Sequence, residues 1–214
     1  MPSIDSVFIC NMALSHIGAK SYIESLDEQT SEAKQCKMWY QFSLTQCLES
    51  FDWSFARKRD NLALASDAPP LQWGFRYQTP ADCVSMRRIW NPAGEQADAV
   101  PYEIETQNST GVKTILTDMA QAIGIYTMLV NSPILFTTLF VEMLSRCVAS
   151  HVAFSLTGKR TIVVDQTNAY QQLLRVAPAY DANERVGQPP RDAEWVRGRT
   201  FYYPYPAPPY TRGY

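Results

Sequence analysis

The chain has 214 residues, of which 46% are hydrophobic and 19% are charged, fractions that are ordinary for a globular protein and argue against overall disorder. With 19 basic and 21 acidic residues, the formal net charge of -2 gives no strong overall attraction for nucleic acid, a membrane surface or an acidic substrate. Any contact with DNA would therefore be local. The length suits one large core, or one domain that carries a sizeable insertion.

The five cysteines form no CxxC pair, and they fall at apolar positions of the predicted elements or within an apolar run. A thiol in such a place behaves as a small hydrophobic side chain, so we predict reduced cysteines and folding in a cytosolic compartment. The N-terminus has neither the basic start nor the apolar run of a secretory signal. We therefore expect that the protein is not exported.

The N-terminal part predicts two helices. Apolar residues recur at helical spacing over residues 3–17, and Gly18 is placed to end that helix. Asp27, Glu28 and Thr30 then supply negative charge and a cap for a second helix of about five turns, which ends near Phe51. Each helix carries one apolar stripe, so both are predicted to pack against other elements.

Residues 57–131 change to short runs of β-branched and aromatic residues separated by Pro, Gly and Asn. Residues 101–107 and 112–117 predict a hairpin, because alternating side chains flank a turn sequence. Further strands are expected near residues 83–90 and 122–130. The region is therefore predicted to be an antiparallel sheet of about four strands.

Two more helices are predicted after this insertion. Ser132 followed by Pro133 is a helix-start signal, and a mostly apolar, central helix should run from there to a stop at Gly158. The same signal divides the uncharged run 120–141, so no membrane span is predicted. A last helix should cover about residues 161–184, with Pro178 kinking it or marking its fraying end.

The predicted fold class is α+β, mainly α. Residues 1–56 and 132–186 are expected to form a four-helix bundle, and residues 57–131 an antiparallel β insertion. Residues 187–214 have no helical period and are rich in Tyr and Pro, so they are predicted to form an extended C-terminal arm.

The C-terminal arm has the composition of a binding segment. Tyr, Trp and Arg dominate the energetics of many interfaces, because they bury a large area and keep a polar end. We therefore predict that the arm contacts another protein or a neighbouring subunit through its arginines and aromatic residues, namely Arg191, Trp195, Arg197, Arg199, Phe201, Tyr202, Tyr203, Tyr205, Tyr210, Arg212 and Tyr214.

No arrangement of residues in the sequence predicts catalysis. His16 lies beside the end of a helix and His151 lies on an apolar helix, so structural roles are favoured for both. The sequence has no metal-binding spacing and no glycine-rich phosphate loop, so no metal and no cofactor are predicted. The acidic residues select no catalytic pair, because they lie near a predicted helix cap and on a hairpin face. The protein is predicted not to be an enzyme.

A basic run, Arg57, Lys58 and Arg59, follows the aromatic segment 51–55. Such a combination could contact a nucleic-acid backbone. Aromatic residues at a junction between a helix and a sheet more often belong to the core, with the cations on its solvated rim. We favour the core and rim interpretation and keep DNA contact as an alternative.

Several phrases in the sequence, in this order, resemble the head-to-tail adaptor proteins of short-tailed bacteriophages, a family also called tail tubular protein A-like or connector-like. They extend from about residue 10 to residue 199, and none identifies the family alone. The phrases are Ala13-Leu-x-x-Ile17-Gly-Ala19, Ile23-x-Ser-Leu-Asp27, Phe51-Asp-Trp-Ser-Phe-Ala56, Gln72-Trp-Gly74, Thr79-Pro-Ala-Asp82, Tyr102-Glu-Ile-Glu105, Ile115-Leu-Thr-Asp118, Leu156-Thr-Gly158 and Trp195-Val-Arg-Gly-Arg199.

The resemblance implies a structural protein of the virion, at the head-tail junction. Members of this family form a dodecameric ring between the portal protein and the tail nozzle protein, with a central channel through which DNA passes without sequence recognition. The resemblance also implies that the arm docks on the portal or on a neighbouring subunit. The Tyr/Pro-rich ending after Arg199 departs from the family's phrases, which leaves the arm's exact partner open.

Two other functions remain as alternatives. A phage-associated cell-wall hydrolase would need a pair of catalytic carboxylates, which the sequence does not single out. A DNA-binding module would use Arg57, Lys58 and Arg59, and its affinity would fall steeply with salt.

Overall fold

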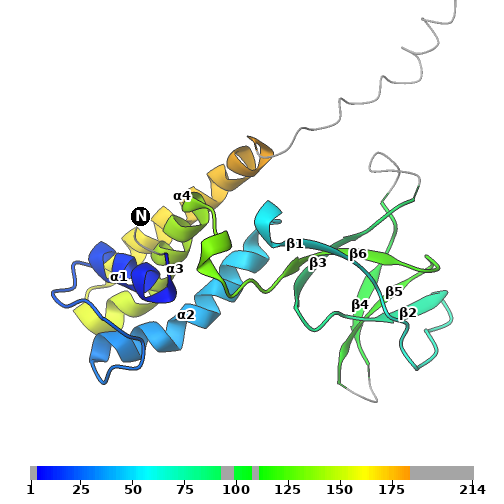
Figure 1. Ribbon diagram of the computed structural model, residues 1–214, viewed down its shortest axis with the longest axis horizontal. Coiled ribbons are helices and arrows are strands. Elements are labelled where there is room, and N and C mark those ends of the chain that lie inside the picture. The colour runs from blue at the N-terminus through cyan, green and yellow to red at the C-terminus, as the bar shows by residue number, and fades with distance from the viewer. Residues whose placement is uncertain (1–3, 93–98, 108–110, 184–214) are drawn as a thin grey trace, which may run out of the picture.

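The computed structural model describes residues 4–92, 99–107 and 111–183. These residues form a helical body and a β part, which lie next to each other and are joined by two passages of the chain (Figure 1). All the described strands fall between the second and third helices in the sequence. The predicted α+β class is therefore confirmed, and the described strands are antiparallel, as predicted.

The first two helices begin at side-chain caps. Helix α1, Ser6–His16, is preceded by Asp5, whose carboxylate accepts a hydrogen bond from the backbone three residues on. Helix α2, Ser31–Ser50, is capped by Thr30 in the same way, as the sequence predicted. Gly18 has a φ of +69°, a conformation that suits glycine just beyond the end of a helix.

Helix α3, Thr138–Thr157, begins later than the sequence predicted. The Ser-Pro signal instead starts a short 3-10 turn, η2, Pro133–Leu135, and the helix is capped by Thr137, whose hydroxyl accepts from the backbone three residues on. The predicted stop is confirmed, because Gly158 adopts the left-handed conformation that ends the helix.

Helix α4, Arg160–Asn183, runs through Pro178 and continues to the end of the described chain. Proline lacks the N–H that would bond to the preceding turn, so this position lacks one helical hydrogen bond. The helix packs along α3, and Ala177 is fully buried in that contact. Packing against α3 offers a reason why the helix continues past the proline.

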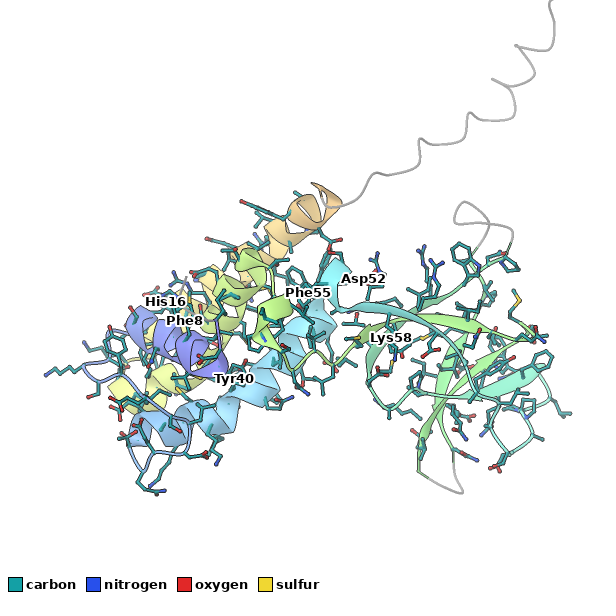
Figure 2. All side chains as sticks on the ribbon, viewed as in Figure 1. Phe8, His16, Tyr40, Asp52, Phe55 and Lys58 are labelled. Atoms are coloured by element: carbon teal, nitrogen blue, oxygen red, sulfur yellow. The ribbon has the colours of Figure 1, made fainter. Side chains whose placement is uncertain are left out.

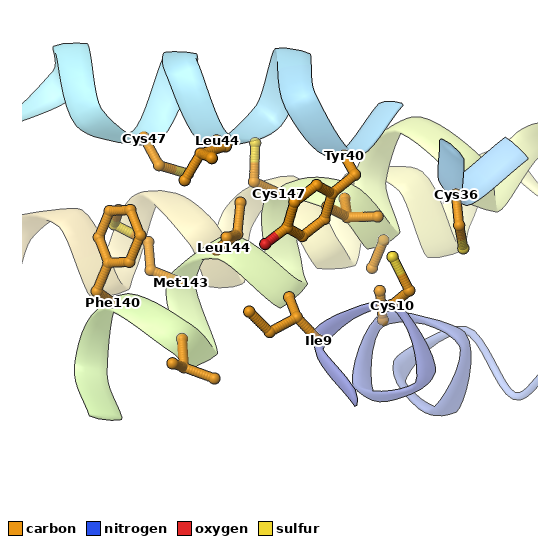
Figure 3. Close-up of a cluster of buried hydrophobic side chains, with 14 of the residues drawn as sticks. Ile9, Cys10, Cys36, Tyr40, Leu44, Cys47, Phe140, Met143, Leu144 and Cys147 are labelled. Atoms are coloured by element: carbon orange, nitrogen blue, oxygen red, sulfur yellow. The ribbon is translucent and has the colours of Figure 1, made fainter. Parts of the chain in front are cut away.

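Helix α3 is the centre of the helical body, because it packs against α1, α2 and α4. Its apolar side chains meet those of α1 and α2 in one core, where Ile9, Leu44, Phe140 and Leu144 are fully buried (Figure 3). Within the described residues, α3 is also the one helix long and apolar enough to cross a membrane, judged by length and composition alone. Of its most apolar stretch, 56% is buried inside the protein, as a central helix requires.

The β part contains six described strands in two antiparallel sheets. Their orders are β1-β6-β3 and β2-β5-β4. The predicted hairpin is confirmed as the pairing of β4 with β5. The strands are β1 (Arg57–Asn61), β2 (Phe75–Gln78), β3 (Cys83–Ile89), β4 (Glu103–Thr106), β5 (Lys113–Thr117) and β6 (Ile123–Met128).

The prediction of one sheet of about four strands was wrong. The described strands form two three-stranded sheets, and the sequence analysis missed β1 and β2. Strand β1 has the sequence Arg-Lys-Arg-Asp-Asn, which has no apolar alternation, and β2 has only four residues. Strand β1 forms by pairing with β6, so its register comes from a distant partner rather than from its own pattern.

Side chains from both sheets form a second, smaller core. It includes Tyr77 and Ile115 from one sheet and Met86 and Tyr126 from the other. Gly124 leaves the space that this packing needs, since a Cβ atom there would lie 2.8 Å from the side chain of Leu62. The β part therefore has its own apolar centre, distinct from that of the helical body.

Candidate functional site

The predicted arm residues all lie outside the described residues, which end at residue 183. The structure therefore neither places nor tests the predicted interface of the arm. The other candidates, the basic run and the two histidines, are described with their surroundings.

The basic run lies on β1, directly after the turn that connects α2 to the β part. Figure 2 shows Asp52 and Phe55 at this connection and Lys58 at the start of the β part. Arg57 forms an ion pair with Asp52, in which its Nε lies 3.0 Å from Oδ1 and its Nη2 contacts Oδ2. This two-point contact fixes the guanidinium against the end of α2.

The other two cations of the run also have intramolecular partners. The Nζ of Lys58 lies 2.9 Å from Oδ2 of Asp82, and Tyr126 donates a 3.0 Å hydrogen bond to Oδ1 of the same carboxylate. Burial opposes ionisation of Asp82, but these two hydrogen bonds, the charge of Lys58 and a backbone hydrogen bond together lower the pKa of Asp82. The guanidinium of Arg59 lies 4.1 Å from the centre of the Trp90 ring, a cation–π contact.

Arg57 therefore joins the end of α2 to the start of β1, whereas Lys58 and Arg59 contact residues within the β part. A nucleic-acid phosphate would have to compete with these carboxylates and with the Trp90 ring. This geometry favours the core and rim interpretation of residues 51–59, while contact with DNA stays a prediction.

A fourth cation, Arg87, which the sequence analysis did not single out, also joins the β part to the end of α2. Nη2 of Arg87, on β3, donates to the carbonyl oxygens of Leu48, Glu49 and Phe51 at 3.0, 3.0 and 2.8 Å. Its Nε donates to Oγ1 of Thr127 at 2.8 Å. The last carbonyls of a helix lack partners in the helix and carry partial negative charge, so a guanidinium is well suited to them.

His16 belongs to a polar cluster between α1, α3 and α4. Its Nε2 lies 3.1 Å from Oγ of Ser145 and 3.6 Å from Oε1 of Glu142, and its backbone oxygen accepts from Gln166. Burial, and then the charge of Arg146, lower the pKa of His16 against the opposing effect of Glu142. The ring is therefore favoured in its neutral form.

These side chains include the residue types of a Ser-His-acid hydrolase, but the serine is not accessible to a substrate. Ser145 is fully buried, and its hydroxyl donates its proton to the carbonyl of Glu142 at 2.7 Å. This backbone acceptor competes with His16 for the serine proton, and the burial of Ser145 keeps a substrate away from its hydroxyl. The geometry favours a structural role for His16, as the sequence suggested.

His151 lies between aromatic side chains on the opposite side of α3. It stacks on Trp39 with ring centres 4.6 Å apart, and its Nε2 lies 3.2 Å from Oε1 of Gln46. Cys147, one turn away, has its pKa lowered by a hydrogen bond from Cys47 more than burial raises it. Its side chain is nevertheless only 1% exposed and its thiol donates to Gln46, so a substrate would not reach it.

In the described ranges, no group of three His, Cys, Asp or Glu side chains is placed to hold a metal ion. The five cysteines are present as free thiols, and four of them are buried in the helical core. Burial raises the pKa of Cys47 well above its ordinary value, which favours the neutral thiol.

No protein-family model matches the sequence. A comparison with curated proteins likewise finds no significant match.

Proposed function

We propose that this chain is a structural head-to-tail adaptor of a short-tailed bacteriophage. In this proposal its four helices act as a bundle, and copies of the chain assemble into a ring, of twelve subunits by family resemblance. The ring lies in the neck of the virion between the portal protein and the tail nozzle protein, and it lines the channel for DNA. The arm of residues 187–214 docks on the portal or on a neighbouring subunit.

The observation that carries the proposal is that the phrases resembling the adaptor family contact one another. In the β part, the backbone N–H of Gly74 donates to Asp118 at 2.8 Å, and Trp73 Nε1 lies 3.3 Å from a carboxylate oxygen of Glu103. Three phrases that are distant in the sequence therefore meet at one place. The resemblance thus concerns residues that shape the β part, which supports a shared fold.

Two other phrases pair with cations of the basic run. Asp52 of the phrase at 51–56 pairs with Arg57, and Asp82 of the phrase at 79–82 pairs with Lys58. The Asp52–Arg57 pair and Arg87 tie the β part to the end of α2, and the Asp82–Lys58 pair holds β1 within the β part. A component that transmits force between head and tail needs such a firm connection, whereas an enzyme needs an accessible set of reacting groups.

Binding to the portal tests the proposal. The full chain and a chain ending at residue 194 are each mixed with the purified portal ring of the same phage, and complexes are separated by sedimentation. We expect the full chain to sediment with the portal and the shortened chain to lose most of that binding, because it lacks Trp195 and the aromatic residues that follow. Equal binding by both chains would keep the adaptor role and remove the role of the arm.

The alternatives predict other results. A cell-wall hydrolase would release soluble fragments from purified peptidoglycan, and a particular Glu→Gln substitution would abolish that release. A DNA-binding module would show affinity that falls with salt and that is lost when Arg57, Lys58 and Arg59 are neutralised. The adaptor role predicts neither effect.

A further inference from the structure

A groove runs along the surface between α3 and α4. Two cavities, of about 460 Å³ and 270 Å³, open along this line and share Glu142 in their walls. Their lining residues recur every three or four positions on each helix, so each wall is one stripe of a helix. We call this surface the α3/α4 groove, lined on α3 by Leu139, Glu142 and Arg146 and on α4 by Ala169, Gln172, Leu173, Val176 and Tyr180.

The larger cavity suits an occupant that is both aromatic and cationic. Trp53, only 2% exposed, contributes to its lining, and Tyr180 presents an exposed ring at 61%. The carboxylates of Glu142 and Asp181 also line it, and none of its described lining residues is Lys or Arg. Glu142 pairs with Arg146 of the smaller cavity at 2.9 Å, and Asp181 accepts from the backbone N–H of Ser54 at 2.8 Å. Rings would bury apolar area there, and a guanidinium would find opposite charge in a partly desolvated place.

The chain itself carries a segment of that chemistry directly beyond the groove. The described part of α4 runs to Asn183, two residues after Asp181. Residues 195–214 contain three arginines, no acidic residue and seven aromatic residues. Residues 184–194 can span up to about 36 Å when extended, and the α4 wall from Tyr180 back to Ala169 is only about 17 Å long. The segment therefore reaches every part of the groove.

We propose that residues 195–214 of the free subunit dock in the α3/α4 groove of the same chain. Attachment to α4 gives the segment an effective concentration in the millimolar range, so even weak intrinsic affinity keeps it bound. The inference deepens the proposed adaptor role, on which its regulatory meaning rests. The docked arm is held back from the portal, and the portal must displace it before the subunit binds.

Proteolysis of the full chain tests this docking without the portal. Chymotrypsin cleaves after Phe201 and Tyr202, and mass spectrometry follows the release of the C-terminal peptides. Val176→Arg places a cation in the groove, where it opposes the arginines of the segment. The matched control is Val164→Arg on the same helix, since Val164 is 56% exposed and lies a third of a turn away from the groove stripe. Neither substitution creates a new chymotrypsin site.

We expect Val176→Arg to speed cleavage at both positions by about tenfold or more, a loss of at least about 1.4 kcal/mol of docking. Chymotrypsin should cleave the Val164→Arg variant at the same rate as the unsubstituted chain. Equal rates for all three chains would overturn the inference. Protection that grows with protein concentration would also overturn it, because a neighbouring copy would then supply the segment.

Circular dichroism checks that the variants stay folded, and Tyr180→Ala replaces Val176→Arg if that variant unfolds. Portal binding separates this inference from the adaptor role. If the chain protects its arm but never binds the portal, docking stands and the adaptor role fails. If it binds the portal but all rates are equal, the adaptor role stands and docking fails.

Discussion

Arg87 is the residue whose loss should most affect the junction between the helical body and the β part. Its guanidinium donates to three carbonyls at the end of α2 and to Thr127 on β6. Hydrogen bonds from a charged donor contribute about 1.5–3 kcal/mol each when well formed, but these share one partly exposed group and are not additive. We therefore expect Arg87→Ala to lower the free energy of unfolding by about 2–4 kcal/mol.

Urea unfolding, followed by circular dichroism and by tryptophan fluorescence, measures this effect. With a slope of about 2–3 kcal/mol/M, the urea midpoint of Arg87→Ala should fall by about 1 M. If the junction couples the two cores, the unfolding transitions of this variant followed by the two probes should no longer coincide. Arg175→Ala, at an exposed position of α4, is the matched control and should change stability by less than about 0.5 kcal/mol. Arg87→Lys should recover only part of the loss, because an ammonium lacks the planar fork.

A midpoint for Arg87→Ala within about 0.2 M of the unsubstituted chain would refute this reasoning, since it corresponds to about 0.5 kcal/mol. Coincident transitions with both probes, despite a large loss of stability, would show that Arg87 stabilises the protein without controlling the coupling between its two parts.

Three further substitutions have expected outcomes. His16→Gln should make the free energy of unfolding depend less on pH between about pH 7 and 5. The pKa of His16 is lowered by folding, so its contribution to stability is fully present above its unfolded pKa and is lost as the pH falls. An unchanged pH dependence in urea titrations would contradict this. Gly124→Ala should lower the free energy of unfolding by about 1–3 kcal/mol, because the new Cβ atom would press on the side chain of Leu62. Gly74→Ala, whose Cβ atom would have its nearest neighbour at 3.4 Å, should lower it by less than about 1 kcal/mol in the same assay. Tyr40→Phe should be neutral or stabilising in thermal unfolding, because within the described part of the chain no group hydrogen-bonds its buried hydroxyl; a loss above about 1 kcal/mol would contradict this.

The helices could be predicted from the sequence because their signals are local. Thr30 and Gly158 act at the ends of helices as their residue types suggest, and the apolar stripes of α1 and α3 meet in one core. The start of α3 was misplaced because Ser132-Pro133 is a valid start signal for a short 3-10 turn as well as for a helix.

The β part was harder to predict because its strands depend on partners far along the chain. Strand β1 consists of polar residues, and its ladder with β6 joins positions such as Arg57 and Thr127. Arg87 was not recognised as a junction residue for the same reason, since its partners lie at the end of α2, almost forty residues earlier. No local pattern indicates that contact.

The central claim is tested most directly by electron microscopy of the full chain mixed with the portal ring of its phage. The adaptor role predicts that a closed ring of subunits forms on the portal, coaxial with the DNA channel. Portal rings that remain bare, under conditions where an authentic adaptor does bind them, would contradict it.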